Sequence, residues 1–300
     1  MAAETPDGDA PARAQRPGLI GRALWWAADY LYAARRQLAI LSLPWAIGRP
    51  RPTPRAWDHG SSTLPELVLL PGVYEHWTFL RPLGDALSAA GYRVTVVHGL
   101  GLNRRGIPDT AERLGAILAA TPPAAAGRVL VAHSKGGLIG KHLLVTSGAA
   151  AAAAAEALAG GDPGDAAAGA TAPADSDTTS PAAGLDPDAA SAAEAPLGVR
   201  GLVAVCTPFA GSRRARFLLG DPSIRAFLPD DETIVMLGRE TSVNGRIVSV
   251  FGRYDPHVPD GSALDGATNI EVAAVGHFRP LSAPVTYQAV LDGVGLLAAS

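Results

Sequence analysis

Residues 129–144, VLVAHSKGGLIGKHLL, decide the fold because they join an apolar strand to a helix through one serine. Residues 129–131 show no alternation of polar and apolar side chains, which is typical of a strand buried on both faces. Apolar residues then recur at helical spacing from Leu138 to Leu143. The stretch therefore predicts a buried strand that turns directly into a helix.

The single residue at this turn is Ser134. Such a tight turn strains the serine backbone and projects its side chain outward, and it leaves room only for small neighbours, here Ala132 and Gly136. The pattern A-H-S-K-G matches a nucleophile elbow with alanine in place of the usual first glycine. The helix N-terminus would favour a developing negative charge there. The alternative is an ordinary turn whose serine caps the helix, and these five residues alone do not decide between the two.

Upstream, residues 66–97 predict a strand over 67–70, a helix marked by leucines from Leu80 to Leu87, and a second strand over 92–97. This βαβ unit implies a parallel sheet with crossover helices. The segment PDTAERLGAILAA then predicts a helix capped by Asp109 or Thr110.

Composition excludes several classes of protein. The 300 residues are 48% hydrophobic, enough for one large α/β domain or two small ones. The single cysteine, Cys206, excludes an internal disulfide and a cysteine-based zinc cluster, and its apolar surroundings predict a buried, unreactive thiol. A net charge of −3 does not indicate a nucleic-acid partner. With no P-loop, dinucleotide fingerprint or metal-ligand cluster, we expect no cofactor and no metal.

Residues 148–196 form a low-complexity insert rich in Ala, Gly and Asp. The insert holds eight acidic and no basic residues, so the remaining chain has 25 basic and 20 acidic residues, a balance of +5. Because it has almost no large apolar side chain to bury, we predict a disordered or partly helical surface insert, with a short helix around 149–155. Strand-like segments continue on both sides, so it interrupts one catalytic domain, residues 58–300.

The N-terminal part of the chain divides in two. Residues 1–17 are polar and rich in Pro and Ala, and we predict that they are disordered. Residues 18–57 form an apolar helical extension, rich in aromatic residues and arginine, and a Pro-rich linker. This extension lacks the pattern of a signal peptide and carries too many charges for a spanning helix. Two interpretations stay open: contact with a membrane interface, or packing on the catalytic domain.

Three downstream segments supply further motifs. GLVAVCTPFAGS, residues 201–212, is a buried strand followed by T-P-F-A-G-S. RIVSVFGRYDPHVPDGS, residues 246–262, is a strand followed by Asp255 in the arrangement D-x-x-V-P, and NIEVAAVGHFRPL, residues 269–281, is a strand followed by His277. With the serine motif, these segments resemble the serine esterase and lipase group of the α/β-hydrolase superfamily, over residues 64–298 apart from the insert.

The resemblance implies an α/β-hydrolase fold, a mostly parallel central sheet with helices on both faces. It implies Ser134 as nucleophile, His277 as base and Asp255 as the acid that orients it, in the chain order that the fold requires. Taken alone, His277 could satisfy only a loop hydrogen bond and Asp255 could start only a turn. LLPGV lies where such lipases carry strand-His-Gly-x, so the backbone N–H groups of Val73 and Lys135 would form the oxyanion hole.

Several neighbours are rivals for these roles. His257 is too close to Asp255 to come from a separate strand end, and Asp260 is a second candidate acid. His133 is expected to point away from the nucleophile and to pack. Lys135 could form a Ser-Lys pair, but adjacent side chains at an elbow diverge. A second His-Gly pair, His98-Gly99, follows a later strand and comes too late for the oxyanion turn.

A cap is expected between the strands near residues 207 and 247, and the substrate-pocket candidates are Tyr74, Phe209, Phe217 and Phe227. The resemblance implies an esterase or triacylglycerol-lipase-like enzyme that cleaves small-molecule or lipid esters with an apolar acyl or alcohol group. An acyltransferase of the same fold and a non-catalytic binding module are the alternatives. We expect a cytoplasmic protein, with residues 18–55 as a candidate contact to the inner face of the membrane.

Overall fold

The structure is a computed structural model that describes residues 19–41, 52–159, 197–218 and 221–299. The segment 1–17 and most of the insert, residues 160–196, lie outside the described residues, as does the linker segment 42–51. The predictions for those segments remain predictions.

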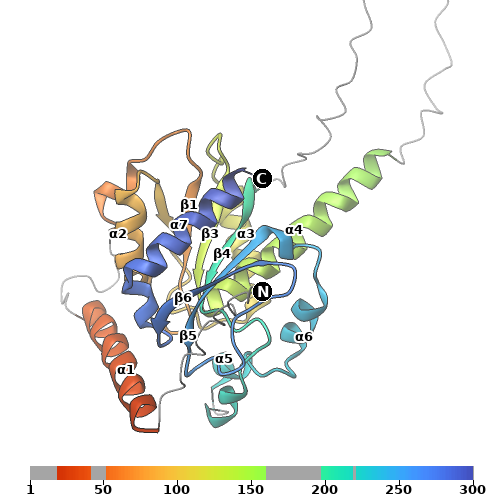
Figure 1. Ribbon diagram of the computed structural model, residues 1–300. Helices are drawn as coiled ribbons and strands as arrows, with labels where there is room; N and C mark the ends of the chain where they lie inside the picture. The colour runs from red at the N-terminus through yellow and green to blue at the C-terminus, as the bar shows by residue number, and fades with distance from the viewer. Residues whose placement is uncertain (1–18, 42–51, 160–196, 219–220, 300) are drawn as a thin grey trace, which may run out of the picture.

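A six-stranded sheet in the order β2-β1-β3-β4-β5-β6 forms the centre of the domain (Figure 1). Each of its pairings is parallel. The strands are β1 Glu66–Leu70, β2 Val94–Val96, β3 Arg128–His133, β4 Val199–Val205, β5 Ile247–Tyr254 and β6 Thr268–Val275. Because the strands are parallel, all their carboxyl ends meet at one edge of the sheet, where loops can bring distant residues together.

Helices cover both faces of this sheet. On one face lie α2 (Arg81–Ala89) and α7 (Pro284–Ala299), and on the other lie α3 (Ile107–Ala119) and α4 (Lys135–Ala159). Strand β1 contributes to both layers, since Leu67 and Leu69 belong to the core with α2 and α7 while Val68 and Leu70 belong to the core with α3 and α4. The predicted fold class is confirmed.

The segment between β4 and β5 holds the short helices of the cap. They are η4 (Arg213–Leu218), α5 (Pro222–Arg225), α6 (Glu232–Arg239) and η5 (Asn244–Arg246). Asp221 and Asp231 cap α5 and α6, because each side chain accepts a hydrogen bond from a backbone N–H two residues later. The remaining short helices are η1 (Arg55–Asp58), η2 (Trp77–Leu80) and η6 (Arg279–Ser282).

The structure corrects three local predictions. Helix α3 begins at Ile107 with Gly106 as its N-cap residue, so the predicted caps Asp109 and Thr110 are wrong. Strand β2 is shorter than the predicted 92–97. The alanine run 149–155 is no separate helix, because it continues α4, whose far end projects from the domain in Figure 1.

Helix α1 (Leu19–Leu41) packs on the catalytic domain. For the inward face of this helix, the packing interpretation of the helical extension therefore holds. Trp25 contacts Tyr254 with ring centroids 5.8 Å apart, and Tyr32 contacts Phe79 at 6.5 Å. Its Asp29 is completely buried. None of the helices within the described residues is long and apolar enough to span a bilayer.

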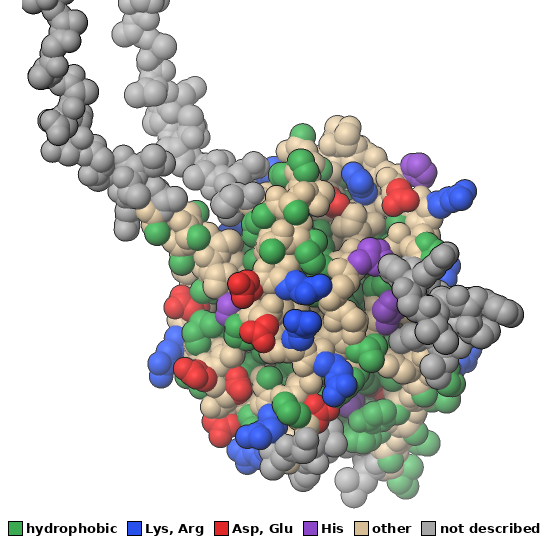
Figure 2. All heavy atoms as spheres, turned by 180° about the vertical axis from the view of Figure 1, so that it is seen from behind, with side chains coloured by type: hydrophobic (Ala, Val, Ile, Leu, Met, Phe, Trp, Pro, Cys, Tyr) green, Lys and Arg blue, Asp and Glu red, His purple; other side chains and the backbone are tan. Residues whose placement is uncertain are grey.

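The outward face of α1 carries an apolar stripe that the rest of the described chain leaves uncovered. Ile20, Leu24, Leu31 and Leu38 are 79%, 64%, 63% and 60% exposed. In Figure 2 hydrophobic side chains gather at the lower right, over this helix, while acidic and basic side chains are interspersed over the rest of that face. Monomeric proteins seldom leave such a contiguous apolar surface without a role.

Candidate active site

Ser134 occupies a strained turn between β3 and α4. Its φ angle of 51° lies in the left-handed region, which non-glycine residues rarely adopt. A Cβ atom at Gly136 would come within 2.4 Å of the Leu70 carbonyl oxygen, and one at Gly137 within 2.0 Å of the Thr207 hydroxyl. Glycine is therefore required at both positions, because the start of α4 crosses directly over the ends of β1 and β4.

The structure brings Ser134, His277 and Asp255 together in one hydrogen-bonded chain. Ser134 Oγ lies 2.9 Å from His277 Nε2, and His277 Nδ1 lies 2.7 Å from Asp255 Oδ2. The residues follow the carboxyl ends of β3, β6 and β5, and all three are buried. This geometry allows the serine to pass its proton to the imidazole while the carboxylate holds the ring in place.

The Asp255 carboxylate is fixed on both sides. Its Oδ1 accepts hydrogen bonds from the backbone N–H groups of His257 at 2.7 Å and Val258 at 3.1 Å. Burial acts to raise the pKa of Asp255, but the charge and hydrogen bond of His277 and the backbone N–H of His257 lower this pKa below its ordinary value. The group therefore stays ionised next to the imidazole.

Two histidines near the serine have pKa values that shift in opposite directions. Burial acts to lower the pKa of His277, but Asp255, with help from Glu75 and Asp29, raises this pKa above the ordinary 6.5. Burial and the neighbouring His277 lower the pKa of His257 to about 3. His257 therefore stays neutral at physiological pH, whereas the charge of Asp255 favours the protonated form of His277.

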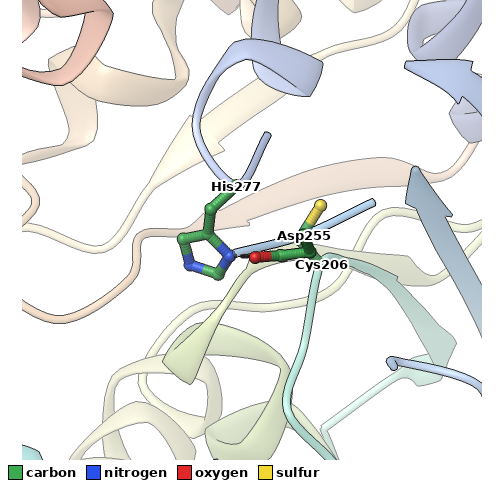
Figure 3. Close-up of side chains that lie close together, drawn as sticks. All are labelled: Cys206, Asp255 and His277. Carbon is green, nitrogen blue, oxygen red and sulfur yellow. Dashed lines mark hydrogen bonds and ion pairs between the residues drawn. The ribbon is translucent and has the colours of Figure 1, made fainter. Parts of the chain in front are cut away.

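Cys206 lies beside this chain. Its thiol and the ligand atoms of Asp255 and His277 lie within 4.8 Å of one another, the only such trio found among the described residues. Burial, together with Asp255, raises the pKa of Cys206 well above its ordinary value, so the sulfur stays protonated. In Figure 3 the dashed line joins His277 to Asp255 and leaves the cysteine aside. The geometry suits a proton relay rather than a metal centre.

Two backbone N–H groups of the loops around the serine have no acceptor within the described residues. The N–H groups of Val73, in the loop after β1, and of Lys135, at the first position of α4, donate no hydrogen bond to any other described residue. The neighbours of Val73 are held, since the Gly72 N–H donates to Glu75 Oε2 at 2.7 Å and the Tyr74 N–H to the Leu102 carbonyl at 2.7 Å. The loop thus leaves one donor available beside the cavity, as an oxyanion hole requires.

A buried pair that sequence reasoning missed, Glu75 and His133, connects this loop to the histidine loop. His133 Nδ1 lies 2.8 Å from Glu75 Oε1, and His133 Nε2 lies 3.0 Å from the His277 carbonyl oxygen. Because a carbonyl oxygen only accepts, His133 Nε2 is the donor in the second contact. His133, predicted to be a packing residue, therefore also makes polar contacts.

The side chain of Lys135 points away from the serine. Its buried Nζ donates to the Asn103 carbonyl at 2.9 Å and to the Arg105 carbonyl, and burial lowers its pKa to about 8. A Ser-Lys pair is therefore not formed. The rival acid Asp260 is also occupied, because it pairs with Arg213 at the surface.

A cavity of about 420 Å³ opens beside Ser134 and His277. Its walls include the predicted residues Val73, Tyr74 and Phe227. Phe209 does not line this cavity. It lies in the core against Lys141, so the prediction that it belongs to the substrate pocket is corrected. The side chain of Phe217 lies outside what the structure describes.

Residues from α1 also line this cavity, and no sequence signal predicted this. Trp26 and Tyr30 contribute to the wall, and the Trp26 ring is stacked on the His257 ring with centroids 5.9 Å apart. Arg214, from the segment between β4 and β5, also lies over the Trp26 ring, with its guanidinium carbon 5.5 Å from the ring centroid. The helical extension is therefore part of the site.

Comparison with known proteins supports the fold. No protein-family model and no curated protein matches the chain. A Bacillus licheniformis lipase, BlEst2 in its mature form, is 12% identical and matches 79% of this chain and 94% of its own with a TM-score of 0.52. A metagenomic carboxyl esterase, MGS0156, is 15% identical and matches 84% of this chain and 81% of its own with a TM-score of 0.48. At 12% identity the likeness to the lipase establishes the fold alone, which is that of the α/β-hydrolases.

The raised pKa of His277 predicts a pH dependence that nuclear magnetic resonance can measure directly. The ring protons of His277 should titrate with a midpoint above 6.5. In Asp255→Asn the midpoint should fall, because the substitution removes the negative charge that favours the imidazolium. The ring of His257 should show no titration between pH 5 and 8. A His277 midpoint below 6.5, or one unmoved in Asp255→Asn, would contradict the assigned pairing.

Proposed function

We propose that the protein is a serine hydrolase that cleaves carboxylic esters. The observation that carries this proposal is the hydrogen-bonded chain from Ser134 through His277 to Asp255, which opens to a cavity beside two free backbone N–H groups. A serine hydroxyl is a weak nucleophile, and this chain supplies the base that it needs. The likeness of the fold to a lipase agrees with the proposal.

In the proposed reaction, His277 Nε2 accepts the hydroxyl proton as Ser134 Oγ attacks the ester carbonyl. The negative charge that forms on the carbonyl oxygen is stabilised by the N–H groups of Val73 and Lys135, and such a donor contributes about 3 to 4 kcal/mol. His277 then returns the proton to the leaving alcohol, which departs and leaves an acyl group on Ser134. A water molecule, activated by the same imidazole, attacks the acyl group and restores the serine.

Two alternatives share parts of this geometry. An acyltransferase would form the same acyl group on Ser134 and pass it to another alcohol or amine instead of water. A non-catalytic binding module would need the cavity but neither the relay nor the strained serine. The positive φ of Ser134 favours catalysis, because strain of this kind at a fully hydrogen-bonded position persists where function requires it.

A fluorophosphonate probe tests the nucleophile and the choice of histidine together. Wild-type protein should be labelled, and Ser134→Ala should not. His277→Ala should reduce hydrolysis of a p-nitrophenyl ester by roughly 10³-fold or more. His257→Ala should lose less than about tenfold, because Asp255 accepts from the backbone N–H of residue 257 and not from its ring. Equal losses from both substitutions would overturn the assignment, and an unlabelled wild-type protein would favour the binding module.

We infer that the ester carries an apolar acyl or alcohol group. The cavity walls are mainly apolar, with aromatic rings from Trp26, Tyr30, Phe227 and Phe278. A volume of about 420 Å³ suits a chain of moderate length rather than a whole triacylglycerol. Burial of each additional CH₂ group contributes about 0.8 kcal/mol, so chain length should govern specificity until the cavity is full.

A series of p-nitrophenyl esters tests this inference. The value of kcat/KM should rise from acetate towards medium chains, by up to about fourfold for each CH₂ buried in the transition state, and then fall. Phe227→Leu should move the optimum to a longer chain. Phe209→Leu, the same change in the core, should lower the thermal midpoint and leave the optimum unmoved. A preference for charged or peptide substrates would exclude this substrate class.

We further propose that the apolar stripe of α1 (Ile20, Leu24, Leu31 and Leu38) contacts anionic lipid, which the chain would meet at the inner face of the membrane. Charge complementarity supports a lipid partner. Arg35 is exposed on the same helix, and two further exposed arginines lie near that helix. Arg214 lies over Trp26 of α1, and Arg104 lies over Tyr74, whose carbonyl oxygen accepts from Gln37 of α1. The contact would bring the cavity close to lipid esters.

Flotation with anionic liposomes tests this contact. The full chain should float at low salt and less at high salt, because the arginines are screened. Leu24→Glu with Leu31→Glu should abolish flotation, whereas Leu296→Glu, at an exposed leucine of α7, should not. Failure of the wild-type chain to float contradicts the lipid contact. A dimer in gel filtration that becomes a monomer in the double variant would also contradict the lipid contact, because the stripe would then bind a second copy of the chain.

A further inference from the structure

Asp29 of α1 is bound to the loop that carries His277. Its Oδ2 accepts from the backbone N–H of His277 at 2.9 Å, and its Oδ1 accepts from those of Phe278 and Arg279, both at 3.0 Å. The side chain is completely buried. Three charge-assisted hydrogen bonds from one short loop thus fix the backbone on which the imidazole is mounted.

The carboxylate and the loop are fitted closely to each other. Gly276, with a φ of 109°, precedes the loop, and a Cβ atom there would lie 2.4 Å from Asp29 Oδ1. No Lys or Arg within the described residues forms an ion pair with Asp29, so backbone donors alone compensate its burial. A buried carboxylate is costly unless its oxygens are satisfied, which makes this contact specific rather than incidental packing.

The same helix also reaches the loop on the other side of the cavity. Gln37 Nε2 donates to the Tyr74 carbonyl at 3.0 Å, next to the free N–H of Val73. Between these two contacts, Tyr32 packs on Phe79 of η2 and Tyr30 lines the cavity, while Trp26, one turn before Asp29, also lines it. We call the loop that carries His277 the histidine loop, and the loop after β1 that carries Val73 and Tyr74 the oxyanion loop. Helix α1 therefore spans the site from the histidine loop to the oxyanion loop.

We propose that Asp29 is a positioning residue for catalysis, and that α1 holds the histidine loop and the oxyanion loop in register through Asp29 and Gln37. The proposal rests on the proposed serine hydrolase function. Neither side chain contacts the reacting atoms. Asp29 acts by fixing the position of His277 Nε2 relative to Ser134 Oγ, and a misplacement of about 1 Å at such a contact costs on the order of 10²-fold in rate.

The principal test compares Asp29→Asn with Asp292→Asn. Asn keeps one acceptor oxygen but turns an NH₂ group towards backbone donors, whereas Asp292 is exposed on α7 and accepts a hydrogen bond from Gln288 of the same helix. In Asp29→Asn, kcat and the rate of fluorophosphonate labelling should fall by roughly 10- to 100-fold, with KM changed by less than about threefold. Asp292→Asn should match wild type.

The pH profile provides a readout that a purely structural role would not move. His277 faces the acidic groups Asp255, Glu75 and Asp29, and the rings of His133 and His257 lie beside it. Removal of one negative charge in Asp29→Asn should shift the acid limb of kcat/KM to lower pH, since Asp29 contributes to raising the pKa of His277. Asp255 and Glu75 remain, so the shift should be smaller than in Asp255→Asn.

Gln37→Met serves as the second variant in case Asp29→Asn does not fold. It removes the donor to Tyr74 at nearly constant side-chain length, and kcat should fall by about 3- to 10-fold at unchanged thermal midpoint. If the probe labels the wild-type protein, and Gln37→Met and any folded Asp29→Asn keep the wild-type kcat, the positioning role alone is overturned. A rise in KM without loss of kcat would also overturn it. Unlabelled wild type would instead refute the proposed function.

Discussion

The close crossing of α4 over β1 is the constraint on which the site depends. At Gly136 the helix passes so near the Leu70 carbonyl that a methyl group has no room. At this crossing Ser134 lies in the left-handed region with its hydroxyl 2.9 Å from His277 Nε2, and the first N–H of α4, as in any helix, has no helical partner. In the proposed mechanism, the nucleophile, its contact to the base and one oxyanion donor all lie at this turn.

The charged groups around this crossing are buried, and backbone groups form hydrogen bonds with each of them. Asp255 accepts two N–H groups, Asp29 accepts three, and Glu75 accepts one from Gly72. Lys135 donates to two carbonyl groups. A buried charge bound to backbone fixes the loop that it contacts, because movement would leave that charge unsatisfied. The main structural effect of these buried charges is therefore to hold the loops that they contact in fixed positions.

The local part of this arrangement was predictable, and the non-local part was not. The strand, elbow and helix around Ser134 follow from patterns within sixteen residues, and the motifs around Asp255 and His277 each lie beside a strand end. Asp29 and His277 are 248 residues apart, and Glu75 and His133 are 58 apart. In the sequence Asp29 is one of a few charges on an aromatic helix, and Glu75 is an acid in a loop. Nothing local distinguishes them from surface residues, and the same holds for Trp26 in the cavity wall.

Together the non-local contacts form a closed series that links the loops beside the cavity. The Tyr74 carbonyl, in the loop after β1, accepts from Gln37, and α1 carries this connection to Asp29 and the loop that holds His277. His133 connects the histidine loop back to Glu75, one residue after Tyr74. In a closed series each loop is held from two directions, so loss of one contact loosens the geometry without separating the loops. The parallel sheet brings the reactive groups to one edge, and this series of contacts keeps the two loops on either side of that edge in register.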